Sequence, residues 1–132
     1  MEFLKFDEER TMAEMVVSKL SEKKWNKNAE DRIEVGGSPD IRFCFLVDST
    51  EDQSEGLSVG CLRIPVGGEL PLHTHAPQEI YYIKSGSGLL LKENHQNQEV
   101  SESDVIFIPK GVKHGLRNNG FTDLEIIWVS QP

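Results

Sequence analysis

Three of the four histidines in this chain lie in two short stretches whose residue types suit metal binding. In the first stretch, His73 and His75 are followed by Glu79. Side chains two residues apart on a β-strand point to the same face, so the two imidazoles would lie side by side as nitrogen ligands. A bend at Ala76-Pro77 would allow the Glu79 carboxylate, at the start of the next strand, to join the same site as an oxygen ligand.

The second stretch supplies a further candidate ligand. An apolar run ends at the turn Pro109-Lys110-Gly111, in which proline presets the backbone and glycine supplies conformational freedom. His114 follows at the expected start of the next strand. If the three histidines only filled a core, no glutamate would be needed beside them. The pattern therefore favours a metal-binding site.

The elements that must position these residues are short strands. From Ile41 onward, runs rich in Val, Ile, Phe and Leu are separated by Gly, Pro, Asn, Asp and Ser, which is typical of an all-β protein. We predict strands near residues 41–47, 57–65, 70–75, 79–85, 88–93, 105–108, 113–117 and 124–129. Strands this short bury little surface unless the sheet folds over itself, so a sandwich or closed barrel is expected.

The N-terminal part has a different pattern. Met12, Met15, Val16 and Leu20 recur at three- and four-residue steps, which predicts a short amphipathic helix between about residues 8 and 25. The run from Met15 to Val17 could equally open a strand. A polar, Gly-containing connection follows up to residue 40. We therefore divide the chain into an N-terminal helical arm and linker, residues 1–40, and a β-barrel domain, residues 41–132.

Composition limits the class of protein. The 132 residues are 37% hydrophobic and 27% charged, which is ordinary for one globular domain. The net charge of −8 argues against nucleic-acid and anionic-membrane partners. The start of the chain lacks the apolar region of a secretory signal, so a cytoplasmic location is expected. Cys44 and Cys61 lack a CxxC spacing and are interpreted as packed thiols.

The two candidate stretches resemble the two conserved motifs of the cupin superfamily, the small RmlC-like barrels of the cupin_2 type. The first family motif, G-x5-H-x-H-x3-E-x6-G, is matched by Gly67, His73, His75, Glu79 and Gly86. The second, G-x5-P-x-G-x2-H-x3-N, is matched by Pro109, Gly111, His114 and Asn118. Its leading glycine is replaced by Ser103, so one tight turn would have to form without glycine.

This resemblance implies a double-stranded β-helix, or jelly roll, with one divalent metal ion inside the barrel. The implied ligands are His73, His75, Glu79 and His114. Three imidazoles and one carboxylate suit Fe, Mn, Ni, Co, Cu or Zn better than Ca or Mg. About two positions would stay open on an octahedral ion and could bind a small organic molecule or oxygen. The alternative is a barrel that has lost its metal.

Two classes of function remain open. The first is a metal-dependent enzyme, an oxygenase, isomerase or lyase, that acts on a small anionic or polar organic molecule. The second is a non-catalytic module that binds or senses such a ligand. A minor alternative is a cupin lyase for dimethylsulfoniopropionate, although lyases of that kind tend to use a late tyrosine as base and this chain has none after Tyr82. Small cupins commonly pair, so a homodimer is expected.

Several other side chains could contribute to the site. Tyr81 should face the same way as Glu79, and we assign it packing or support of the ligands ahead of acid–base catalysis. Arg42, Arg63 and Lys92 alternate with apolar residues and could face either solvent or the barrel. If one of them faces inward, it would favour a carboxylate ligand. His95 lies in an expected turn and is interpreted as a surface histidine.

Overall fold

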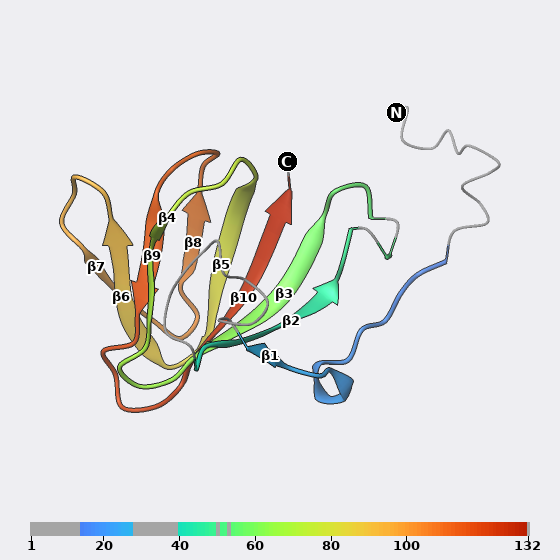
Figure 1. Cartoon of the computed structure of the whole chain (residues 1–132), viewed down its shortest axis with the longest axis horizontal. Coiled ribbons are helices and arrows are strands. Elements are labelled where there is room, and N and C mark those ends of the chain that lie inside the picture. Colours follow the sequence, from blue (N-terminus) through green and yellow to red (C-terminus); the bar gives the residue numbers. More distant parts are fainter. Residues whose placement is uncertain (1–13, 28–39, 50, 53, 132) are drawn as a thin grey trace.

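The computed structural model describes residues 14–27, 40–49, 51–52 and 54–131, and most of them belong to short antiparallel strands (Figure 1). The strands are β1 (Asn26–Lys27), β2 (Arg42–Val47), β3 (Ser58–Ile64), β4 (Glu69–His73), β5 (Gln78–Ser85), β6 (Ser87–Lys92), β7 (Gln98–Ser101), β8 (Val105–Ile108), β9 (His114–Arg117) and β10 (Leu124–Gln131). The predicted all-β class is confirmed.

These strands form two sheets. The larger has the order β1-β2-β3-β10-β5-β8 and the smaller has the order β4-β9-β6-β7. Neighbours in both sheets are often far apart in sequence, which is the crossed connectivity of a jelly roll. The two sheets pack face to face, and the expected double-stranded barrel is therefore what the chain forms.

The core lies between the two sheets. Its fully buried side chains come from both: Ile64, Ile83, Leu124 and Ile126 from the larger sheet and Leu116 from the smaller. Alternation explains which residues point inward, since β5 reads buried, exposed, buried, exposed from Glu79 onward. Burial of this apolar surface is the main favourable term for the fold.

All eight predicted strands are present, with ends that differ by a few residues. Two strands were not predicted. The first, β1, has only two residues, and the second, β7, is polar, with Val100 as its only buried residue. The tight turn at Ser103 forms without glycine: Ser103 adopts φ of 76° and donates a backbone hydrogen bond to Ile83.

The predicted N-terminal helix is wrong over the part that the structure describes. Residues 14–19 are not helical, and only a 3-10 turn at Leu20–Glu22 appears. Residues 8–13 of the predicted helix lie outside the described residues. An isolated helix of a few turns needs an apolar face packed on the protein to be stable. Met15 is 98% exposed and Val16 is 56% exposed, so that packing is missing.

The described residues contain no helix with the length and apolar character needed to cross a membrane.

Candidate metal site

Two of the three histidines are brought together by strand pairing. His73 is the last residue of β4, and His114 is the first residue of β9. The two residues are directly opposite each other in the antiparallel ladder, so their side chains leave the sheet on the same face. Their ring centroids lie 4.3 Å apart.

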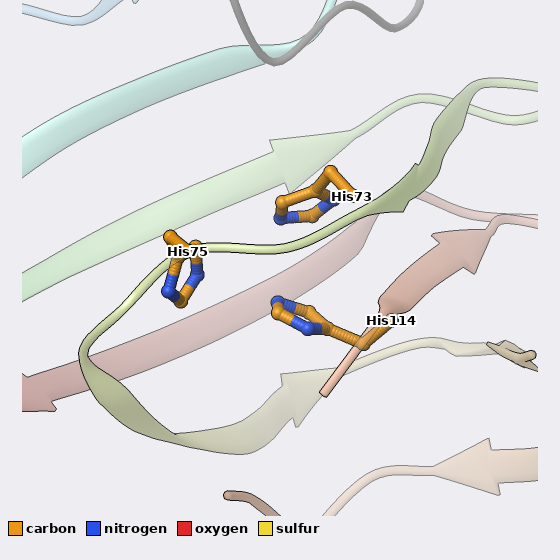
Figure 2. A group of neighbouring side chains, drawn as sticks. All are labelled: His73, His75 and His114. Carbon is orange, nitrogen blue, oxygen red and sulfur yellow. The ribbon is translucent and has the colours of Figure 1, made fainter. Parts of the chain in front are cut away.

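His75 completes the group from outside the strand. We predicted a strand up to residue 75, but β4 ends at His73, and His75 lies in the connection to β5. Its ring centroid still lies 5.7 Å from that of His73 and 5.1 Å from that of His114. Figure 2 shows the three imidazoles around one common space. One ring nitrogen from each lies within 4.8 Å of the other two, which is close enough for all three to bind one metal ion.

The backbone fixes the orientation of all three rings. Nδ1 of His73 lies 2.9 Å from the carbonyl oxygen of Pro71, Nδ1 of His75 lies 3.1 Å from that of Pro77, and Nδ1 of His114 lies 2.8 Å from that of Val112. A carbonyl oxygen can only accept, so each Nδ1 must carry the proton and donate. In the neutral rings Nε2 is then the atom with the free lone pair, so each ring can bind a metal ion through Nε2.

Two of these Nε2 atoms are buried without a hydrogen bond. They belong to His75 and His114. A buried polar atom with no partner costs free energy, so each such atom in a native protein calls for an explanation. For Nε2 of His114, a metal ion that accepts the lone pair would supply that explanation, whereas Nε2 of His75 also has the Glu79 carboxylate beside it.

Glu79 places an oxygen atom beside His75, but it is not part of the group whose ligand atoms all lie within 4.8 Å of one another. It is the second residue of β5, it is 9% exposed, and its Oε1 lies 2.5 Å from Nε2 of His75. The two atoms do not align as a hydrogen bond. A cation that contacts both atoms would be held by one imidazole nitrogen and one carboxylate oxygen. Carboxylate and imidazole donors together fit a divalent transition metal.

His114 is held neutral. Burial, together with the neighbouring His73 and His75, lowers the pKa of His114 to about 4, and the hydrogen bond to the Val112 carbonyl opposes this only partly. At neutral pH the ring therefore carries no proton on Nε2. A metal ion does not have to displace a proton from this ligand.

Tyr81 lies beside the histidines but within the core. It is 4% exposed, and its ring centroid lies 5.7 Å from that of His114. It points to the same face of β5 as Glu79, as predicted from their spacing. Its position is compatible both with packing and with contact to a ligand.

The structure shows which way each of the three cationic side chains faces, a question that the sequence left open. Arg63 faces outward, where it pairs with Glu125 and stacks on the Trp25 ring at 4.3 Å. Arg42 is opposite Arg63 in the ladder and shares that face. Lys92 is opposite His114 and therefore shares the face of the histidines. Alternation along the sequence shows which side chains share a face of β6, but not which of the two faces is covered. It therefore could not identify Lys92 as the cation that shares the face of the histidines.

Comparison with known proteins agrees with this arrangement. A family model described as "Cupin domain" matches residues 60–130, which include all four candidate ligands. The chain belongs to the cupin family.

Relatives of this cupin have names that refer to small ligands. An oxalate-binding protein of Thermotoga maritima is 30% identical over 95 residues, which cover 71% of this chain and 78% of that protein. A dimethylsulfoniopropionate lyase of Ruegeria pomeroyi is 29% identical over 57% of this cupin and 37% of the lyase. The crystal structure of a predicted oxalate decarboxylase from Thermotoga maritima is 29% identical with a TM-score of 0.75, covering 89% of this chain and 98% of that one.

Proposed function

We propose that this cupin binds one divalent transition-metal ion through Nε2 of His73, His75 and His114 and through the Glu79 carboxylate. The observation that carries the proposal is the common orientation of the rings. Each Nδ1 is committed to a backbone carbonyl, and the other ring nitrogens face one space. Fe, Mn, Ni, Zn, Co and Cu all accept this donor set, and the donor set does not choose among them.

The bound metal would hold a small anionic or polar organic molecule in the barrel. Four protein ligands leave about two positions open on an octahedral ion, and a metal at such a site acts as a Lewis acid or a redox centre. The names of the relatives support this substrate class, since they refer to oxalate, to dimethylsulfoniopropionate and, for a protein of Arabidopsis thaliana, to auxin.

We propose an enzyme ahead of a non-catalytic binding module. Tyr81 is the candidate acid–base group. The residue is buried, and its ring centroid lies 5.7 Å from that of His114. Oxygenation, isomerisation and elimination all suit an open metal site. The dimethylsulfoniopropionate lyase activity remains the minor alternative, because the chain has no tyrosine after Tyr82 and covers only 37% of the lyase it matches.

Metal analysis tests the proposed site. Purified protein, or protein reconstituted with Fe(II), Mn(II), Ni(II) or Zn(II), is expected to hold about one metal ion per chain by elemental analysis. His75→Ala and His114→Ala should each remove most of that metal, because each deletes one of the converging nitrogens. His95→Ala is the matched control, since His95 is exposed in the turn after β6. Wild-type protein without metal after reconstitution would contradict the proposal.

A turnover assay separates the enzyme from the binding module. Each metal form is mixed with a panel of keto acids, thiols, catechols and sulfonium compounds while oxygen consumption and absorbance are followed. Product formation from any compound excludes the pure binding module. Ligand binding without turnover across the panel contradicts the enzyme.

We further propose that this cupin is a cytoplasmic homodimer and that residues 1–40 act as an arm beside the barrel domain of residues 41–132. Cys44 and Cys61 are both buried, which fits their interpretation as packed thiols. The exposed apolar residues of the arm support contact with a second chain.

A further inference from the structure

A cavity opens in the side of the barrel next to the histidines. It has a volume of about 420 Å³ and lies where strand β8, at the edge of the larger sheet, faces the ends of β6 and β9. Its walls include the apolar side chains of Leu90, Ile106 and Ile108, and His114 lies in the same wall. The volume is in the range of sites that hold small organic molecules.

One of the residues that line this cavity is the cationic Lys92. It lines the cavity, it is only partly exposed, and it is directly opposite His114 in the ladder between β6 and β9. Its ammonium donates to the amide oxygen of Gln98 at 2.7 Å. Gln98 is neutral, so this contact satisfies a hydrogen bond and leaves the charge uncompensated.

The other lysine in the cavity wall differs from Lys92 in its partner. Lys113 lines the same cavity but pairs with Glu93 at 3.3 Å, and Lys84 pairs with Glu125 at 2.9 Å. Within the part of the chain that the structure describes, Lys92 has no carboxylate partner. A lysine that faces a cavity without a counter-ion favours an anionic ligand, because the ligand supplies the missing charge.

We propose that the side cavity binds a small carboxylic acid with an apolar body and that the Lys92 ammonium holds its carboxylate. The apolar body would contact Leu90, Ile106 and Ile108, which have no polar group to offer it. This inference deepens the proposed function, because His114 belongs both to the metal site and to the cavity wall. Lys92 is then the residue that selects the charge of the ligand.

A matched pair of probes tests the role of the charge. Phenylacetate and phenylacetamide have the same apolar body, and only the first is anionic at neutral pH. Isothermal titration calorimetry on the metal-reconstituted wild-type protein should show at least tenfold tighter binding of phenylacetate. Lys92→Gln should abolish this preference by weakening phenylacetate binding alone, and Lys92→Arg should keep most of it.

Lys113→Gln is the control variant, since its ammonium already has a carboxylate partner and its loss should change the preference less than twofold. A preference that survives in Lys92→Gln, or a wild-type protein that binds neither probe, would overturn the inference. Metal content is measured in the same samples. Protein that carries no metal but still prefers phenylacetate would contradict the metal site and support the role of Lys92.

Discussion

Asn118 shows how one buried side chain links segments at the end of β9 that lies away from His114. It is 1% exposed, and its Nδ2 donates to the carbonyl oxygens of Ile64 and Thr122, both at 2.8 Å. Its Oδ1 accepts from the backbone N–H of Gly120 at 3.0 Å. The amide therefore joins the end of β3 to the loop between β9 and β10, and its role is structural.

We expect Asn118→Ala to lower the free energy of unfolding by about 3 kcal/mol, because it removes three hydrogen bonds and leaves the buried Ile64 carbonyl without this donor. Urea unfolding followed by circular dichroism measures the change. Asn119→Ala is the matched control, since Asn119 is exposed and should change stability by less than about 0.5 kcal/mol. Equal stability of the two variants would contradict this role for Asn118.

At the residue scale, the sequence predicted which side chains could form the site but not how they meet. His73 and His114 are 41 positions apart in the chain, and their contact depends on the pairing of β4 with β9. Strand pairing between distant segments is not encoded in local periodicity. The orientation of the rings also depends on carbonyl groups of Pro71, Pro77 and Val112, whose directions only the folded backbone fixes.

At the scale of the elements, three strands are linked by charges on their outer face. Glu125 of β10 accepts from Arg63 of β3 at 3.1 Å and from Lys84 of β5 at 2.9 Å. Burial raises the pKa of the Glu125 carboxyl, but Lys84 and Arg63 lower it more, so the pKa lies below its ordinary value. The folded state therefore favours the ionised carboxylate.

Replacing Glu125 by Gln should lower the free energy of unfolding at pH 7 by about 1 kcal/mol, since these partners are partly exposed. Because the folded-state pKa is depressed, the contribution of the carboxylate is complete above the unfolded pKa of about 4.3. It is lost as the pH falls through the folded-state value.

Wild type and Glu125→Gln should thus differ in urea unfolding at pH 7, and the difference should shrink as the pH falls through the depressed folded-state pKa of Glu125. Glu93→Gln provides a control, because Glu93 pairs with Lys113 on a more exposed part of the surface. A stability difference that stays the same from pH 7 to pH 3 would exclude the ion pairs as its cause.

The elements themselves were predicted well where alternation and burial coincide. In β10 the buried positions Leu124, Ile126 and Trp128 are all apolar, and in β5 the buried positions Tyr81 and Ile83 are apolar. β7 was not predicted because it is mostly polar and follows a turn, so its residues were read as part of that turn. For the N-terminal segment, a helix was predicted that does not form in the described residues. Its apolar spacing is that of a helix, but its apolar side chains are exposed and do not pack on the described chain.

At the scale of the whole molecule, two apolar surfaces are exposed among the residues that the structure describes. The first is a strip on the outer face of β5 and β8, where Ile80 is opposite Phe107 and Tyr82 is opposite Val105. The four side chains are between 40% and 62% exposed. The second is the segment from Met15 to Val17, which extends away from the barrel in Figure 1. Contiguous exposed apolar surface of this kind marks an interaction site.

A second copy of the chain would cover both surfaces, because each copy offers a strip and an extended apolar arm. We therefore expect wild-type protein to sediment as a dimer in analytical ultracentrifugation. The double variant Val105→Lys, Phe107→Lys should sediment as a monomer with unchanged circular dichroism, because two charges would be buried without partners in the interface. Val66→Lys, which changes an equally exposed apolar residue outside the strip, should remain dimeric. A monomeric wild type, or a dimer that persists in the double variant, would rule out this interface.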